Sequence, residues 1–176
     1  MIYTSEIIEK EAVFEVAKLM IAAARTAPKT KGVDTILTMI VDGAEKDAVA
    51  AEMRRLGESS GAASFTRDAG NVDASDYVVL LATTDKPAEL PSCSLCGFEN
   101  CAATTAAGAA CVFNMSDLGT AAGSACAVAA RHWIDNRLMY TVGKATKNIG
   151  LFKTGIRVCY GIPVSAKGKN IYFDRK

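Results

Sequence analysis

Four of the six cysteines in this 176-residue chain lie within nineteen residues of one another. They are Cys93, Cys96, Cys101 and Cys111, and the first two form a Cys-x-x-Cys pair that is followed directly by Gly97. We expect a chain of the reducing cytosol, where such a cluster is not used as a disulfide framework. A tight group of thiols in that setting indicates metal or redox chemistry.

The spacing of these cysteines suits a [4Fe–4S] cluster, because four thiolates can hold one cluster with one ligand on each iron. The Cys-x-x-Cys spacing places two ligands at one corner of the cluster, and Gly97 permits a tight turn with positive φ. The residues before Cys111 are rich in Ala and Thr, and we expect them to form a helix that covers the cluster. Residues 91–112 are therefore predicted to be a cluster-binding segment.

Two alternatives to an iron–sulfur cluster stay open at this stage. A structural zinc site also uses four cysteines, but zinc ribbons and fingers usually bring two Cys-x-x-Cys pairs, and this chain has one. The thiols could also be catalytic or incidental. The remaining cysteines, Cys126 and Cys159, fall in a predicted helix and a predicted strand, where packing is the expected role.

Other polar residues give weaker indications of chemistry. His132 is the only histidine, close to the end of a predicted helix, and we expect a surface or capping role for it. With no second histidine, hydrolysis by a Ser–His or Cys–His pair is disfavoured. Asp117 and Asp135 are expected to cap helices. Tyr140 could stack on a planar ligand or pack in the core.

A short basic segment contains Arg25, Lys29 and Lys31. Such side chains can bind a phosphate as cationic donors. The alternative is a solvated loop in which the charges complement the C-terminal end of the preceding helix. Further along, Arg67 and Asp68 are expected to form a salt bridge within a loop.

The elements that must position these residues follow from hydrophobic periodicity and from turn residues. The predicted helices cover residues 6–25, 45–57, 116–134 and 144–152, the predicted strands cover residues 33–41, 77–83 and 157–164, and residues 58–76 are predicted to be a loop. Gly143 would directly precede the last helix. Strands that alternate with helices indicate an α/β or α+β layered domain, and the length suggests a single one.

Composition narrows the classes of function. Half of the residues are hydrophobic and 22% are charged, which is typical of a globular protein. The net charge of +1 does not favour nucleic-acid binding, which needs a basic surface. No apolar run is long enough to span a bilayer, and residues 1–6 do not have the basic start of a signal peptide. We therefore expect a cytoplasmic protein that binds neither nucleic acid nor membranes.

The run Cys-x-x-Cys-Gly-Phe-x-x-Cys resembles the compact iron–sulfur domain found beside redox modules in anaerobes. Nearly the whole chain resembles a family of uncharacterised bacterial and archaeal proteins, which carry this ferredoxin-like segment within a nitroreductase-like chain. The landmarks of the resemblance are residues 23–32, 67–72, 135–143 and 161–170. It implies an α+β, nitroreductase-like layered sandwich over residues 1–176, with a central mixed sheet, flanking helices and the cysteine-rich insertion.

The wider nitroreductase resemblance also implies an intertwined homodimer that binds FMN at its interface. Gly143 would approach flavin N5 from the start of a short helix, and the basic residues near the C-terminus would reach the phosphate. The Arg-x-Ser segment that clamps this phosphate in nitroreductases has no match in residues 1–6. The residues placed around FMN by the resemblance are Arg25, Lys29, Lys31, Gly143, Lys167 and Lys169.

Together these observations predict an iron–sulfur redox protein. The leading hypothesis is a flavin-linked, nitroreductase-like oxidoreductase that passes electrons between a one-electron carrier, such as a ferredoxin, and a small acceptor. The alternative is a non-enzymatic [4Fe–4S] module for electron transfer or cluster binding that has no flavin. A third hypothesis is a scaffold stabilised by zinc.

Overall fold

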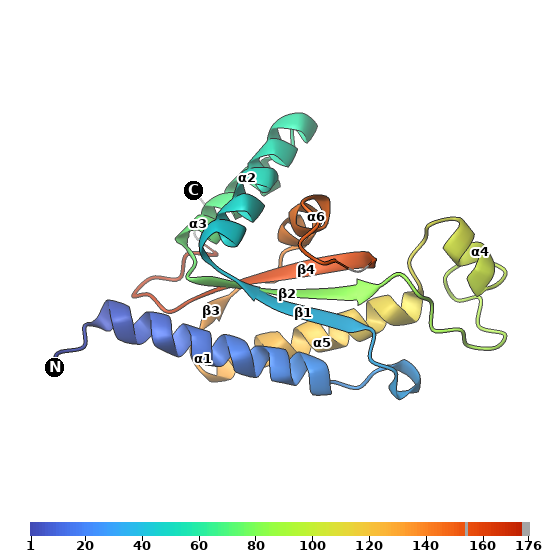
Figure 1. Ribbon diagram of the computed structural model, residues 1–176, viewed down its shortest axis with the longest axis horizontal. Coiled ribbons are helices and arrows are strands. Elements are labelled where there is room, and N and C mark those ends of the chain that lie inside the picture. The colour runs from blue at the N-terminus through green and yellow to red at the C-terminus, as the bar shows by residue number, and fades with distance from the viewer. Residues whose placement is uncertain (154, 174–176) are drawn as a thin grey trace.

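The structure is a computed structural model, and it describes residues 1–153 and 155–173. A sheet with the strand order β1-β2-β4-β3 separates two layers of helices (Figure 1). The elements, in chain order, are α1 (Ser5–Thr26), the 3-10 turn η1 (Thr30–Gly32), β1 (Ile36–Val41), α2 (Gly43–Ser60), α3 (Ala63–Ala74), β2 (Tyr77–Thr84), α4 (Cys101–Ala106), α5 (Val112–Arg131), β3 (Asp135–Asn136), α6 (Tyr140–Asn148) and β4 (Ile156–Ser165).

Strand β2 is the centre of the molecule, and both of its faces are buried. Val79 and Leu81 point into the core formed with α1 and α5. Val78 and Leu80 point into a second core, formed with α2, α3 and α6. A strand covered on both faces is expected to be a continuous apolar run, which is how residues 77–83 were predicted.

The sheet is antiparallel at every pairing of the described strands, so the expectation of a mixed sheet is wrong. The cause lies in residues 58–76, which were predicted to be a loop. They contain the last turn of α2 and the whole of α3, and these two helices pack together. The chain therefore re-enters the sheet at the same end at which it left the sheet. Val41, the last residue of β1, therefore pairs with Val78 at the start of β2.

Helix α3 was missed because its sequence is rich in Ser, Gly, Asp and Asn. The helix buries Phe65, Ala69 and Val72, which follow one another by four and three residues. This spacing puts the three side chains on one face, against the second core. Tertiary burial of this stripe outweighs the weak helix propensity of its polar residues.

The last helix begins earlier than predicted, so Gly143 lies inside α6 and not before it. A Cβ atom at Gly143 would lie 1.7 Å from the carbonyl oxygen of Cys159 in β4. Glycine is needed here because α6 crosses the backbone of β4 at very close range. Strand β4 itself continues through Gly161 and Pro163.

Helix α5 is central to the first core. It buries Ala121, Ala122, Ala125 and Ala129 in the first core, where it packs along α1. Among the described residues, no helix combines the length and apolar character needed to cross a membrane.

Candidate metal centre and adjoining pocket

The four clustered cysteines line one cavity of about 80 Å³. They belong to the segment between β2 and α5, which carries α4 and projects beyond the end of the sheet (Figure 1). Cys93, Cys96, Cys101 and Cys111 are each partly exposed. The fold therefore brings together the four thiols that the spacing singled out. Cys126 and Cys159 lie apart from them; Cys126 packs against the first core and Cys159 is buried in β4.

Tight turns and helix starts position these thiols. Gly97 has a φ of +83°, as predicted, and its N–H donates to the carbonyl of Ser94 at 3.1 Å. The Asn100 side chain accepts a hydrogen bond of 2.9 Å from the N–H of Ala103 and so caps α4, the Ala/Thr-rich helix that was expected before Cys111. Cys111 is the N-cap residue of α5, so the start of that helix fixes its position.

The pKa of Cys96, in the cavity, is shifted in the opposite direction from the pKa values of the two cysteines of the core. Cys96 Sγ lies 3.1 Å from Thr104 Oγ1. Hydrogen bonds from this hydroxyl and from the backbone of Phe98 lower the pKa of Cys96. Burial, by contrast, raises the pKa of Cys159 to about 12 and also raises that of Cys126. Cys96 is therefore the easier thiol to ionise, while the core thiols are inert.

An iron–sulfur cluster and a zinc ion place different demands on four thiols. A zinc ion needs all its sulfurs about 2.3 Å from one point. In the part of the chain that the structure describes, no three His, Cys, Asp or Glu side chains are grouped closely enough to hold a single metal ion. A four-iron cluster needs four thiolates spread around it, one for each iron. Four cysteines around the wall of one cavity match that requirement.

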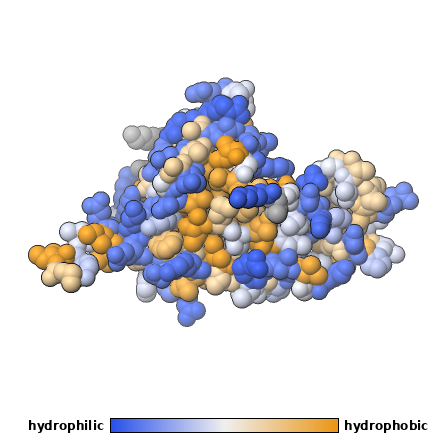
Figure 2. Space-filling model, in the orientation of Figure 1, coloured by the Kyte–Doolittle hydropathy of each residue, from blue (hydrophilic) through white to orange (hydrophobic). Residues whose placement is uncertain are grey.

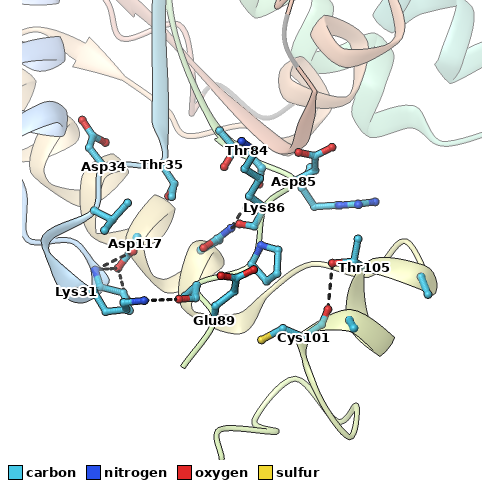
Figure 3. Close-up of a pocket in the computed structure, with 18 residues that line it drawn as sticks. Lys31, Asp34, Thr35, Thr84, Asp85, Lys86, Glu89, Cys101, Thr105 and Asp117 are labelled. Atoms are coloured by element: carbon cyan, nitrogen blue, oxygen red, sulfur yellow. Dashed lines mark hydrogen bonds between the residues drawn. The ribbon is translucent and has the colours of Figure 1, made fainter. Parts of the chain in front are cut away.

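A second, larger pocket of about 970 Å³ opens beside the cysteine cavity (Figure 3). The two share Cys101 and residues 87–89. In Figure 3 the sulfur of Cys101 points from α4 toward Glu89. The pocket lies at the C-terminal end of β2, and its wall comes from the segments after α1 and β2, from α4 and α5, and from the start of β4.

Two buried polar residues of α5 hold the inner wall of this pocket. The Asp117 carboxylate accepts hydrogen bonds from the Thr30 N–H at 2.9 Å and from the Thr30 hydroxyl at 3.0 Å. Asn114, one turn earlier, donates from Nδ2 to the carbonyl of Lys86 at 2.6 Å. Asp117 was expected to cap a helix, and this prediction is wrong. It lies in the second turn of α5, and its hydrogen bonds with Thr30 fasten the turn η1 to that helix.

Three buried polar atoms around the pocket have no hydrogen-bond partner among the described residues. They are Thr35 Oγ1, Asn114 Oδ1 and Arg157 Nε. These residues lie far apart along the chain and were not predicted to share a site. Asn114 gave no signal, because the helix was predicted to begin at residue 116, whereas α5 begins at Val112.

The basic segment after α1 is held by internal contacts. Arg25 pairs with Asp34, with 3.0 Å between Nε and Oδ2. Lys29 Nζ donates to three backbone carbonyls at the end of α1, at 2.7 to 2.9 Å. Lys31 Nζ donates to the carbonyl of Ala88 at 3.2 Å and is the one of the three basic side chains that lines the pocket. These contacts match the alternative in which the charges complement the helix end.

The second basic segment lies at the opposite end of the sheet. Lys167 Nζ donates to the carbonyl of Ala74 at 2.6 Å, next to the start of β2, and Lys169 follows two residues later. Lys31 lies beyond the other end of β2, a strand of eight residues that spans roughly 25 Å. Gly143 is buried in α6. Within one chain, the fold does not bring together the six residues that the resemblance placed around FMN.

The other candidate residues have structural contacts. His132 is exposed at the C-terminal end of α5, as expected. Asp135 does not cap a helix; it lies in β3 and accepts a hydrogen bond from Asn170 at 2.8 Å. The Arg67–Asp68 salt bridge is present at 2.7 Å, within α3 and not in a loop. Tyr140 is 58% exposed and makes an edge contact with the ring of Phe65.

Two sequence comparisons place the chain among relatives. Residues 107–175 match the model of a family described as "Uncharacterized protein containing a ferredoxin domain (DUF2148)". A protein of Archaeoglobus fulgidus, described as an uncharacterized protein, is 39% identical over 175 residues. That match covers 95% of this chain and 94% of the relative.

Solved structures identify the fold. A protein of Desulfovibrio desulfuricans, assigned as a nitroreductase and solved in complex with FMN, superposes with a TM-score of 0.61 at 12% identity, covering 92% of this chain and 78% of its own. The NADPH:FMN oxidoreductase of Vibrio harveyi, complexed with NAD+, gives a TM-score of 0.53 at 9% identity, covering 92% and 63% respectively. The fold is therefore nitroreductase-like, as the sequence resemblance implied.

Proposed function

This chain belongs to the family of uncharacterized proteins that contain a ferredoxin domain, and we propose that it is an iron–sulfur redox protein. The ligands of its iron–sulfur cluster would be Cys93, Cys96, Cys101 and Cys111. The observation that carries the proposal is that all four thiols line one small cavity, next to an open pocket of ligand size. A bound [4Fe–4S] cluster would supply one-electron transfer.

The residues of this segment support such a role in three ways. Thr104 and the backbone of Phe98 stabilise negative charge on the sulfur of Cys96. The cap formed by Asn100 fixes the start of α4 and so the position of Cys101. Cys101 forms part of the wall between the cavity and the pocket, which places a molecule in the pocket beside a cluster ligand. This arrangement favours an oxidoreductase that passes electrons to a small acceptor, rather than a protein that only carries electrons.

Anaerobic reconstitution with iron and sulfide tests the proposal. We expect about four irons per chain and a broad absorbance near about 400 nm that bleaches on reduction. Cys93→Ser, Cys96→Ser, Cys101→Ser and Cys111→Ser should each lower the iron content. Cys126→Ala is the matched control and should retain it, because that thiol packs against the first core. A colourless protein that binds one zinc ion, or full iron in every variant, would contradict the proposal.

A flavin-linked form of this activity is the second candidate, and two structural neighbours are FMN proteins by their titles. The pocket beside Cys101 lies within the size range of ligand sites. The proposed phosphate residues do not fit one phosphate in a single chain, because Lys31 and Lys167 lie at opposite ends of β2. They could meet only if two copies of the chain combine.

We also propose that the chain forms a homodimer. Apolar side chains are exposed along α1, with Ile8 at 51% and Leu19 at 48%. Figure 2 shows apolar residues at the N-terminal end and over the middle of the visible face, where β1 lies in Figure 1. β1 is an edge strand, and an apolar surface beside an unpaired edge favours association.

Light scattering and FMN titration of the reconstituted protein separate these forms. A dimer that binds FMN supports the flavin-linked oxidoreductase. An iron-replete dimer that binds no FMN supports the module without flavin, which would exchange single electrons with a ferredoxin-type partner. A monomer would overturn the dimer proposal and, with it, the shared phosphate site.

A further inference from the structure

Thr104 is a buried residue of the cysteine segment, and its hydroxyl contacts one of the four clustered thiols. Its exposed fraction is 2%, and its Oγ1 atom lies 3.1 Å from Cys96 Sγ. The same Oγ1 atom also lies 3.1 Å from the carbonyl oxygen of Asn100, one turn earlier. The hydroxyl therefore lies between a sulfur and a carbonyl, and it has a single hydrogen to donate.

The chemical form of Cys96 decides where this hydrogen points. In the thiol form, the S–H can donate to Thr104 Oγ1 while the Thr104 hydroxyl donates to the carbonyl of Asn100. A cysteine that ligates iron is a thiolate and has no hydrogen to donate. In that form the Thr104 hydroxyl is the donor of the pair, so the hydrogen bond is kept when the hydroxyl turns toward the sulfur.

The helix is not disturbed when the hydroxyl turns. The carbonyl of Asn100 also accepts a hydrogen bond of 3.1 Å from the backbone N–H of Thr104, so it keeps a partner. The side chain of Asn100 caps α4 through the N–H of Ala103, which fixes the first turn of the helix and with it the position of Thr104. Because Thr104 is buried, water does not compete for its hydroxyl.

This contact distinguishes Cys96 from the other three clustered cysteines. Among the residues that the structure describes, no side-chain donor is hydrogen-bonded to the sulfur of Cys93, Cys101 or Cys111. A single substitution at Thr104 therefore removes the side-chain hydrogen bonding of the whole ligand set, and its effect can be measured without changing any ligand.

We propose that Thr104 is a positioning residue that raises the reduction potential of the [4Fe–4S] cluster, by donating its hydroxyl hydrogen to the sulfur of Cys96. This inference rests on the proposed function. Reduction adds one electron from a one-electron carrier and no proton, so the negative charge shared with the cysteine sulfurs increases. A hydrogen bond to a sulfur stabilises the reduced form more than the oxidised form, because it strengthens as the charge on the acceptor grows.

Thr104→Val tests the hydrogen bond, because valine has nearly the same shape as threonine and no hydroxyl. We expect the reconstituted variant to hold as much iron per chain as the wild type. Its equilibrium constant for reduction should fall about tenfold, which corresponds to about 59 mV toward negative potential for one electron. Anaerobic titration with dithionite, followed by the electron paramagnetic resonance of the reduced form, measures the shift.

Two further variants separate hydrogen bonding from packing. Thr104→Ser keeps the hydroxyl and loses a methyl group, so its potential should stay close to that of the wild type. Thr105→Val is the matched control, because the hydroxyl of Thr105 is exposed and donates to the carbonyl of Cys101 at 3.0 Å and not to a sulfur. Its potential should not change. Thr104→Ala provides the same measurement if Thr104→Val does not fold.

The possible results separate this inference from the proposed function. Iron-replete Thr104→Val with the potential of the wild type overturns the role of Thr104 and leaves the proposed function intact. Equal shifts in Thr104→Val and Thr104→Ser also overturn it, since lost packing would then account for the change. A wild-type protein that binds no iron refutes the proposed function, and the role of Thr104 with it.

Discussion

At the scale of single residues, buried and surface ionic contacts contribute differently to the free energy of unfolding. Asp68 is 4% exposed, and its carboxylate accepts from the buried hydroxyl of Thr141 at 2.7 Å and from Arg67. Asp68→Ala should lower the free energy of unfolding by about 2–3 kcal/mol, because it leaves Thr141 without a partner and removes a charge-assisted bond. Urea unfolding measures this. Asp73→Ala, which breaks the exposed pair with Arg54, should cost less than about 1 kcal/mol. Equal losses in the two variants would refute the argument.

Glu52 gives the stability a predictable dependence on pH. Its carboxylate accepts from Arg55 at 2.7 Å and, across to α6, from Asn148 at 2.8 Å. These hydrogen bonds, that of Arg55 first, lower the pKa of Glu52 from 4.5 to about 2. The folded protein therefore favours the ionised form. The resulting stabilisation is complete above about pH 4.5 and is lost as the pH falls toward about 2.

Glu52→Gln tests this dependence. Unfolding by urea from pH 6 to pH 3 should show a smaller loss of stability on acidification for the variant than for the wild type. Parallel pH profiles of the two proteins would show that Glu52 does not contribute.

At the scale of elements, the contact between α6 and β4 depends on a missing side chain. A Cβ atom at Gly143 would lie 1.7 Å from a backbone oxygen of β4, so Gly143→Ala forces the helix away from the strand. We expect a loss of about 1–3 kcal/mol in the free energy of unfolding, as for overpacked cores. Gly70→Ala, in the exposed part of α3 with nothing near the new atom, should instead stabilise by about 0.5–1 kcal/mol. Thermal unfolding of both variants measures the difference, and a stable Gly143→Ala would contradict this account.

The elements also show where the sequence was informative. The apolar run of β2, which is buried on both faces, and the periodicity of α1, which is buried on one face, predicted both elements correctly. Helix α3 escaped prediction, since its three buried apolar residues lie among polar ones with weak helix propensity. Its absence also left the direction of β2 undetermined, because the return of the chain through α3 makes β2 antiparallel to β1.

At the scale of the whole molecule, the four cysteines were predictable as a group because they are close in the sequence. The adjoining pocket was not, since Thr35, Asn114 and Arg157 meet only after the sheet forms. The basic residues expected around a phosphate are, within one chain, separated for a related reason. Lys31 and Lys167 look alike in the sequence, but the fold places them at opposite ends of β2.

The proposed association of two chains is tested at this scale. Ile8 and Leu19 are eleven residues apart, about three helical turns, so they lie on one face of α1. Both are about half exposed, while the opposite face of α1 is buried against the sheet and α5. Replacing both by Lys should leave the fold and the iron content unchanged, because neither side chain enters the core. The double variant should be monomeric by light scattering at concentrations where the wild type is dimeric, since burying two lysines in an interface is costly. If the variant stays dimeric, this face of α1 is not the interface.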